Sequence, residues 1–204
     1  MLSIFETIKS RISANSYDPA RKLSDEEISE LIELATQAPS AFNGQNWRFV
    51  AVRSEEAKRR LLSAAYGQQK VADAAVTFIV CGKLDTHHTL AAALKPSLDQ
   101  HILSEDLYQG WIGAAQRMYQ DNASFQRDEA VRSASLAAMT LMLAAQGKGL
   151  VSCPMIGFNP EAVAESFDLK AEDVPVMLVT VGHPGPDNWP KKPRKPVAEV
   201  LSFT

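Results

Sequence analysis

Residues 128–146 are very rich in Ala, Leu and Met, and residues 134–145 are apolar almost without interruption. The pattern predicts one long helix that ends at Gly147 and Gly149. A helix that is apolar on most sides is buried on most sides, either in a large core or against a second subunit. In a chain of only 204 residues, burial against a second subunit would mean an obligate dimer.

Apolar periodicity along the rest of the chain predicts helices that alternate irregularly with about four strands. Residues 75–82 form a continuous apolar run, which is typical of a fully buried strand. Ser24 is followed three residues later by Glu27, the pattern of a capping box, and this predicts a helix up to Pro39. We further expect helices over residues 2–12, 55–65, 106–120 and 160–167, strands over 47–53, 150–154 and 176–182, and an extended segment over 184–196.

The composition fits a single globular domain over residues 1–204, because 46% of the residues are hydrophobic and 22% are charged. A net charge of -3 gives no general attraction to nucleic acid or to an anionic membrane. Cys81 and Cys153 are the only cysteines, so we expect neither a disulfide framework nor a zinc motif. Residues 1–10 lack the apolar core of a signal peptide and no run approaches the ~20 apolar residues of a membrane span, so we expect a cytoplasmic protein.

Several common functional motifs are missing from the chain. No Gly-x-Gly-x-x-Gly follows a predicted strand, so neither a Rossmann dinucleotide site nor a P-loop is expected. His87 and His88 follow the strand 75–82 in what we expect to be an exposed loop, and their spacing fits no zinc pattern. We therefore expect no metal site and, without a Gly-x-Ser-x-Gly motif, no serine hydrolase.

A polar turn, Ala-Pro-Ser-Ala-Phe-Asn-Gly-Gln-Asn-Trp at residues 38–47, joins the predicted second helix to the first strand. Pro39 fixes one backbone dihedral angle and Gly44 relaxes another. Ser40, Asn43 and Gln45 supply hydrogen-bonding groups. Such a turn either lines a polar, planar ligand or only connects two elements, and for Asn43 and Gln45 both roles stay open.

Three further segments are considered together with this turn: Arg-Ile-Ser-Ala-Asn at 11–15, Pro-Met-Ile-Gly-Phe at 154–158 and Lys-Pro-Arg-Lys-Pro at 192–196. Together with Pro-Ser-x-x-Asn-x-Gln-x-Trp at 39–47, their order resembles the nitroreductase family of FMN-dependent oxidoreductases, nearly from end to end. The resemblance implies an α+β fold of three layers, α/β/α, in which helices flank a mixed, mainly antiparallel sheet of four to five strands. It also implies an extended C-terminal tail and a homodimer with FMN sites at the subunit interface.

The same resemblance implies which residues bind FMN. Arg11 and Ser13 match the positions that hold its phosphate and ribityl end, and the tail cations Lys192 and Arg194 match the second half of that clamp. Backbone N–H groups of Ile156 and Gly157 would approach N5 and O4 of the flavin. Further matches lie in the turn that reaches the flavin of the partner subunit, in the strip along one flavin face, and in the segment before the buried strand: Pro39, Ser40, Ala41, Asn43, Gln45, Pro154, Met155, Gln68 and Lys70.

Asn15 departs from the family pattern, because many members carry Lys or Arg there, near the N1 and O2 edge of the flavin. Asn can form a hydrogen bond at that edge but cannot neutralise the charge of a reduced flavin. Lys70 matches another position that faces the same edge in some members. We hypothesise that Lys70 supplies the missing charge; the alternative is an exposed lysine on a helix.

The resemblance implies an oxidoreductase that passes hydride from NAD(P)H through flavin N5 to a nitroaromatic, quinone or similar acceptor, with no catalytic side chain. Enal reduction, reductive dehalogenation, flavin reduction and flavin binding without turnover stay open as alternatives. Trp111 and Phe125 lie on or after a helix that borders the substrate side in this family. They are therefore substrate candidates, with ordinary core packing as the alternative.

Overall fold

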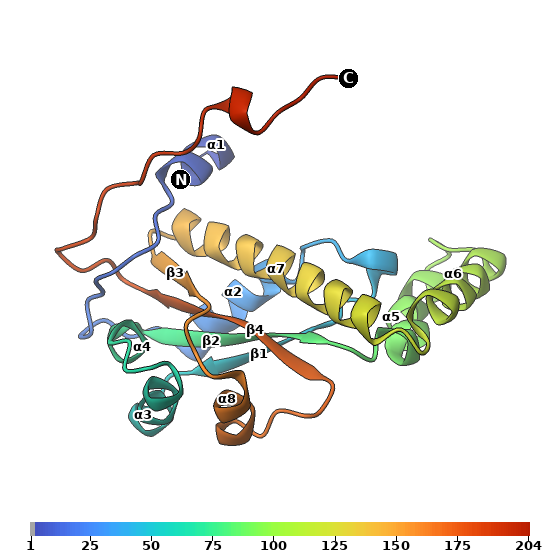
Figure 1. Ribbon diagram of the computed structural model, residues 1–204, viewed down its shortest axis with the longest axis horizontal. Helices are drawn as coiled ribbons and strands as arrows, with labels where there is room; N and C mark the ends of the chain where they lie inside the picture. The colour runs from blue at the N-terminus through green and yellow to red at the C-terminus, as the bar shows by residue number, and fades with distance from the viewer. Residues whose placement is uncertain (1–2) are drawn as a thin grey trace.

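The computed structural model describes residues 3–204, and a four-stranded antiparallel sheet lies at its centre (Figure 1). Its strands are β1 (Trp47–Val52), β2 (Val76–Lys83), β3 (Val151–Met155) and β4 (Asp173–Gly182), in the order β1-β2-β4-β3. Ile79 of β2 lies opposite Val50 of β1 on one side and Leu178 of β4 on the other. The strands β2 and β4 are therefore central, and β1 and β3 form the two edges.

Helices cover both faces of the sheet and make three layers (Figure 1). One face packs against α2 (Asp25–Ala35) and α7 (Ala123–Gly147), the other against α3 (Glu55–Ala64) and α8 (Pro160–Ser166). The expected three-layer α+β fold is thus confirmed. The remaining elements are α1 (Ile4–Ser10), α4 (Lys70–Asp73), α5 (Thr86–Asp99), α6 (Glu105–Tyr119) and the 3-10 turns η1 (Ala41–Asn43) and η2 (Val197–Glu199).

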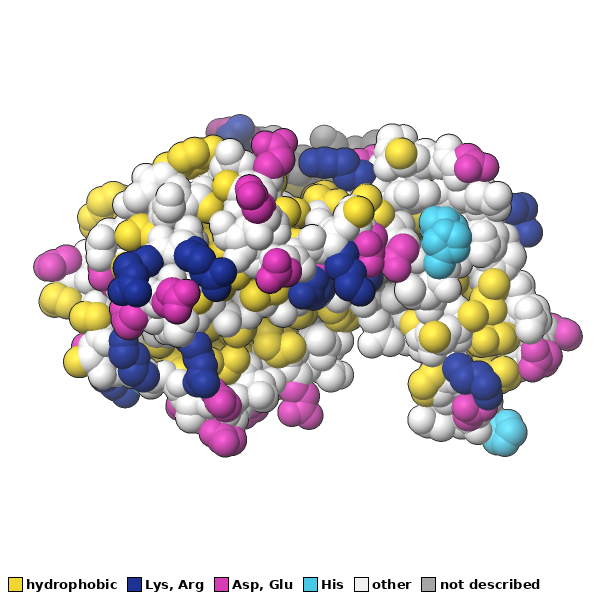
Figure 2. All heavy atoms as spheres, turned by 90° about the horizontal axis from the view of Figure 1, so that it is seen from below, with side chains coloured by type: hydrophobic (Ala, Val, Ile, Leu, Met, Phe, Trp, Pro, Cys, Tyr) yellow, Lys and Arg dark blue, Asp and Glu magenta, His cyan; other side chains and the backbone are white. Residues whose placement is uncertain are grey.

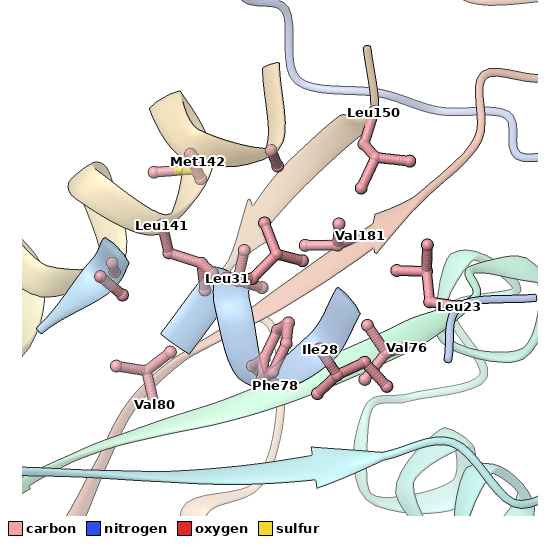
Figure 3. Close-up of a cluster of buried hydrophobic side chains, with 14 of the residues drawn as sticks. Leu23, Ile28, Leu31, Val76, Phe78, Val80, Leu141, Met142, Leu150 and Val181 are labelled. Atoms are coloured by element: carbon pink, nitrogen blue, oxygen red, sulfur yellow. The ribbon is translucent and has the colours of Figure 1, made fainter. Parts of the chain in front are cut away.

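The larger hydrophobic cluster fills the space between the sheet, α2 and α7. Phe78 and Val80 of β2 are fully buried and lie near Leu31 of α2 and Leu141 of α7 (Figure 3). Each such side chain contributes about 1.5–3 kcal/mol when it leaves water. Both faces of β2 are buried, which explains why residues 75–82 show no alternation of polar and apolar side chains.

The apolar stripes of the first two helices are only partly buried. The capping box of α2 is present, because Ser24 Oγ accepts from the Glu27 N–H (3.2 Å) and the Glu27 carboxylate accepts from the Ser24 N–H (2.8 Å). Ile28, Leu31 and Ala35 are buried, whereas Leu34 is exposed. In α1, Ile4, Phe5 and Ile8 are all exposed, and Leu2 lies outside the described residues.

The segment that we expected to be an exposed loop with His87 and His88 is the helix α5, so that expectation was wrong. His87 is only 8% exposed, and its ring lies 3.9 Å from that of His88, measured between centroids. Burial, followed by the neighbouring His88, lowers the pKa of His87. Leu90 and Leu94 hold the helix in place, because they pack against α6, whose last residue is Tyr119.

The surface carries charges of both signs, and α5 with α6 forms a projecting lobe. Lys, Arg, Asp and Glu side chains are interspersed over the face made by α3 and α8 (Figure 2). Within residues 3–204, no helix combines the length and apolar character needed to cross a membrane. The same residues hold no group of three or more His, Cys, Asp or Glu side chains arranged to bind a metal ion.

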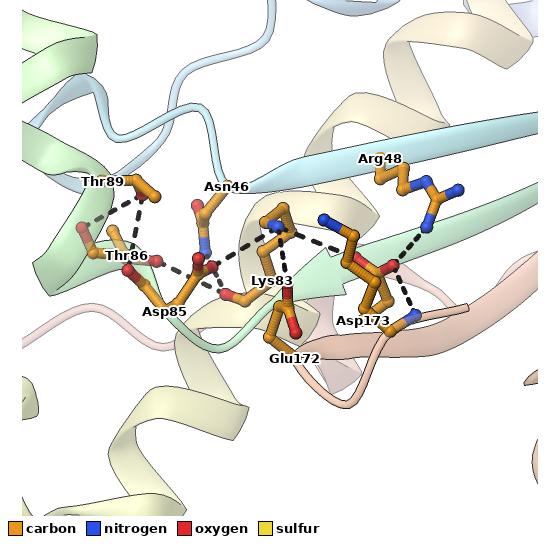
Figure 4. A network of polar contacts seen from close by, with 9 residues as sticks. Asn46, Arg48, Lys83, Asp85, Thr86, Thr89, Glu172 and Asp173 are labelled. Atoms are coloured by element: carbon orange, nitrogen blue, oxygen red, sulfur yellow. Dashed lines mark hydrogen bonds and ion pairs between the residues drawn. The ribbon is translucent and has the colours of Figure 1, made fainter. Parts of the chain in front are cut away.

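Charged groups are paired where the end of β2 and the start of β4 meet the start of α5 (Figure 4). The buried carboxylate of Asp173 forms an ion pair with Arg48. The ammonium of Lys83 lies 3.6 Å from Asp85, 3.7 Å from Glu172 and 3.9 Å from Asp173. This pairing offsets the cost of removing the Asp173 carboxylate from water.

The helix α7 lies directly on the backbone of β2 at Gly82. A Cβ atom added to Gly82 would lie 2.2 Å from the carbonyl oxygen of Ala130 and 2.9 Å from its Cα. Both obstructing atoms belong to the backbone, so no rotamer change could relieve the clash. The absence of a side chain at Gly82 sets the distance between α7 and the sheet.

We expect Gly82→Ala to lower the free energy of unfolding by about 1–3 kcal/mol or more, because α7 must move away from the sheet. Gly110→Ala is the matched control, since Gly110 lies on exposed α6 with open space at its Cβ position. It should be neutral or stabilise by up to about 1 kcal/mol. Urea unfolding followed by circular dichroism measures both, and equal stabilities of the two variants would contradict the close approach.

Candidate functional site

Two segments from opposite ends of the sequence line one small hollow of about 90 Å³. Arg11, Ser13, Lys192 and Arg194 all contribute to its wall. The structure thus brings together the four residues that the sequence assigned to one clamp. A doubly anionic group of phosphate size suits such a hollow, because guanidinium and ammonium groups form charge-assisted hydrogen bonds with it.

The edge strand β3 determines where the hollow lies. Ser13 forms an isolated parallel bridge with Ser152, and the Ala14 N–H donates to the Ser152 carbonyl (2.9 Å). The chain after α1 therefore runs along the free edge of the sheet. The hydroxyl of Ser152 is buried and has no hydrogen-bond partner among the described residues.

A backbone strip at residues 154–158 leads out of β3. Pro154 and Met155 end the strand, and Ile156 is 83% exposed. The Gln68 amide donates to the Gly157 carbonyl (2.6 Å), and a Cβ atom at Gly157 would lie 3.2 Å from Gln68 Nε2. The structure therefore joins Gln68 to the strip, a contact that the sequence did not predict, and leaves Ile156 exposed.

Lys70, the first residue of α4, contacts β3 at Cys153. Its ammonium donates to the thiol of Cys153 (3.4 Å), and among residues 3–204 it forms no ion pair with a carboxylate. It is half-buried rather than fully exposed. The positive charge of Lys70 is therefore held in place without a compensating negative charge.

Asn15 lies beside the hollow, but its carboxamide is engaged by the tail. Asn15 Nδ2 donates to the Asp187 carbonyl (2.7 Å), and Oδ1 accepts from the Trp189 N–H (3.0 Å). The side chain that we expected at a flavin edge thus uses both polar groups to contact the segment before Lys192. Asn15 is uncharged, so position 15 supplies no positive charge beside the hollow.

The polar turn at 38–47 lies elsewhere, at the lobe of α5 and α6, far from α4 and β3 (Figure 1). Ser40 Oγ accepts from the Gln45 N–H (2.9 Å), which stabilises the turn. Phe42, Asn43 and Gln45 all have positive φ angles, of 54°, 54° and 48°. Within one chain, the turn therefore does not meet the other cofactor-binding candidates; its own candidates are Pro39, Ser40, Ala41, Asn43 and Gln45.

The substrate candidates lie with this turn. Trp111 contacts Phe42 edge-on, with ring centroids 6.1 Å apart. Phe125 contacts Tyr119 edge-on at 5.1 Å. Both are partly buried against the cluster that holds α5 on α6, so packing already explains much of their environment.

The sequence missed several residues that shape the hollow. Trp189 and Lys191 form part of its wall, and Asn188 hydrogen-bonds to Ser16. Cys153 was noticed only as a cysteine without a disulfide partner, yet it contacts Lys70. The composition of the tail indicated an extended segment but contained no local pattern for these long-range contacts.

Comparisons with known proteins agree with this geometry. The family model described as "Nitroreductase family" matches residues 8–183. "Putative NAD(P)H nitroreductase YodC" of Bacillus subtilis is 36% identical over 182 residues, which cover 89% of this chain and 90% of YodC. "Putative NAD(P)H nitroreductase MhqN" of the same organism is 33% identical over 205 residues and both whole chains.

A solved structure shows the same fold over the full length. The crystal structure of a "putative nitroreductase in complex with FMN" from Exiguobacterium sibiricum aligns with a TM-score of 0.92 and 29% identity, over 100% of this chain and 98% of that chain. The chain therefore belongs to the nitroreductase family.

Proposed function

We propose that the protein is an FMN-dependent oxidoreductase that takes hydride from NAD(P)H and reduces a nitroaromatic, quinone or similar acceptor. The observation that carries the proposal is the convergence of Arg11, Ser13, Lys192 and Arg194 on one hollow, where Ser13 is bridged to Ser152 of the edge strand β3. The names of the relatives, NAD(P)H nitroreductases, and the FMN bound by the Exiguobacterium protein support the choice of cofactor and donor.

The residues around the hollow fit FMN. Arg11, Lys192 and Arg194 would hold its phosphate, and the Ser13 hydroxyl would contact the phosphate or the ribityl chain. The open backbone at Ile156 and Gly157 would lie along the flat ring, with Pro154 and Met155 leading into it. FMN, when bound, supplies hydride-transfer chemistry at its ring N5. The chain therefore needs to orient substrates and leave one face accessible, rather than supply a nucleophile.

Lys70 would stabilise negative charge at the edge of the bound ring. Its ammonium is fixed by the Cys153 thiol and lacks a carboxylate partner among the described residues. A positive charge that is not already neutralised interacts more strongly with a new anion. Lys70 would thus perform the task that many relatives give to a cation at the position of Asn15.

A homodimer would complete each site. Apolar side chains are exposed on α1 (Ile4, Phe5 and Ile8), on α7 (Leu136 and Met139) and in the tail (Val197, Val200, Leu201 and Phe203). An apolar groove of about 570 Å³ runs between α1, α2 and α7. Exposed apolar surface of this kind marks an interface, and a second copy would bury it. The turn at 38–47 would then reach the flavin of the partner subunit, with Trp111 and Phe125 near the acceptor.

The purified protein is expected to bind FMN and absorb visible light as a flavoprotein. Anaerobic titration with NADH or NADPH should bleach the flavin, and an added nitroaromatic or quinone should restore its colour. A colourless protein whose melting temperature does not rise with FMN would contradict the proposal. A flavin that neither nucleotide bleaches would indicate binding without turnover.

We expect Lys70→Met to lower the midpoint potential of bound FMN by tens of millivolts, because the reduced flavin loses a stabilising cation. For a two-electron couple, ~30 mV corresponds to about 1.4 kcal/mol. Redox potentiometry measures the shift. Lys170→Met, which removes an exposed lysine before β4, should leave the potential unchanged; an unchanged potential in Lys70→Met as well would rule out this role.

A shared site predicts complementation between two defective chains. Arg11→Ala damages the half of the site within its own chain, and Asn43→Ala damages the half given to the partner. In randomly mixed dimers, about a quarter of all sites regain both intact halves, because half of the dimers are mixed and each contains one complete site. FMN titration of the refolded mixture measures this fraction.

The control mixes Arg11→Ala with Lys192→Ala, whose residues line the same hollow in one chain. That mixture should recover no intact sites. If the mixture of Arg11→Ala with Asn43→Ala also recovers none, the turn does not complete the partner's site.

A further inference from the structure

Two asparagine side chains fasten the tail to the segment after α1. Asn188 Oδ1 accepts from the N–H groups of Asn15 (2.9 Å) and Ser16 (3.2 Å), and its Nδ2 donates to the carbonyls of Ser16 (2.8 Å) and Gly185 (3.2 Å). Asn15 in turn binds the backbone of Asp187 and Trp189. Each carboxamide therefore acts both as donor and as acceptor, and we call this pair of asparagines the tail latch.

The tail backbone packs closely against this segment at Gly185. A Cβ atom at Gly185 would lie 2.2 Å from Ser16 Oγ and 2.9 Å from the Tyr17 N atom. Lys191 adds a second anchor, because its ammonium donates to the carbonyls of Ile8 (2.8 Å) and Lys9 (2.7 Å) at the end of α1. An ammonium at this place also interacts favourably with the negative end of the helix.

By contrast, Lys192 and Arg194 have no comparable anchor among residues 3–204. Arg194 donates to the carbonyls of Lys192 (2.8 Å) and Pro193 (3.3 Å), and the Lys192 ammonium lies 5.1 Å from the ring centroid of Trp189. These contacts are all within the tail. The position of the two cations relative to Arg11 therefore depends on the anchors that precede them.

Holding these cations together has an electrostatic cost. Arg11, Lys192 and Arg194 line a hollow of only about 90 Å³ with Lys191 in the same wall, and like charges repel at such short range. The tail latch opposes that repulsion with uncharged hydrogen bonds. By fixing the tail, these hydrogen bonds would lower the ordering cost of binding an anion.

We propose that Asn188 and Asn15 are positioning residues for the phosphate of the cofactor: they fasten the tail and thereby place Lys192 and Arg194 opposite Arg11. The inference rests on the proposed function, because the phosphate is that of FMN. It also gives a reason for Asn at position 15. Lys and Arg have no acceptor for the Trp189 N–H, so a cation there could not make this contact.

The test compares FMN with riboflavin, which lacks the phosphate. The affinities of FMN and riboflavin are measured by fluorescence titration at one ionic strength. The ratio of the FMN affinity to the riboflavin affinity gives the contribution of the phosphate. We expect Asn188→Ala and Asn15→Ala to weaken FMN binding by roughly tenfold or more and to leave riboflavin binding within about threefold. Asn15→Lys should lower the ratio as well, although it adds a positive charge.

The matched control is Asn122→Ala. Asn122 caps α7 at the lobe, accepting from the Phe125 N–H (3.2 Å), so its loss removes a comparable side chain to backbone contact elsewhere. It should lower the melting temperature without changing the ratio of affinities. Arg11→Ala is the positive control and should lower the ratio strongly.

The outcomes separate the two hypotheses. If the wild-type protein binds riboflavin as tightly as FMN, the phosphate clamp of the proposed function is wrong, and the role of the tail latch is wrong with it. If Arg11→Ala lowers the ratio but Asn188→Ala and Asn15→Ala weaken both ligands equally, or neither ligand, the clamp stands and the positioning role is overturned. A selective loss of FMN affinity in both asparagine variants supports it.

Discussion

The contact between α7 and the central strands organises the rest of the molecule. Gly82 lets the helix backbone at Ala130 rest on β2, and the buried side of α7 then fills the space above β2 and β4. The helix ends at a glycine pair, where Gly149 has a φ angle of +75° that other residues rarely adopt. The chain reverses there and enters β3 at the edge of the sheet. The place of β3 therefore follows from the length and close approach of α7.

An uncovered edge strand leaves backbone groups without partners, and this protein covers β3 with its own first segment. The bridge from Ser13 to Ser152 brings Arg11 to that edge, and the tail latch brings Lys192 and Arg194 to the same edge. The hollow is thus built from contacts between residues more than a hundred positions apart. Its geometry depends on hydrogen bonds to the backbone.

Local signals explain which parts the sequence predicted. Ser24 and Glu27 form their capping box within one turn, and residues 75–82 are apolar because both faces of β2 are covered. The sequence did not predict the helix α5. Pro96 lies within this helix, and its few buried residues include polar ones such as His87. The candidate site residues were found through a family resemblance. The tail latch was not, because an asparagine that binds distant backbone looks like any other asparagine in the sequence.

The division of charge around the site follows from these contacts. Four cations line the small hollow, and a fifth at position 15 would increase their repulsion and remove the acceptor that holds Trp189. A cation for the ring edge must therefore come from an element that does not depend on the tail. Lys70 meets this condition, because it belongs to α4 and its ammonium is held by the Cys153 thiol of β3 rather than by the tail. Under the proposed function, Asn15 keeps the phosphate half of the site assembled, and Lys70 is left to adjust the redox half independently.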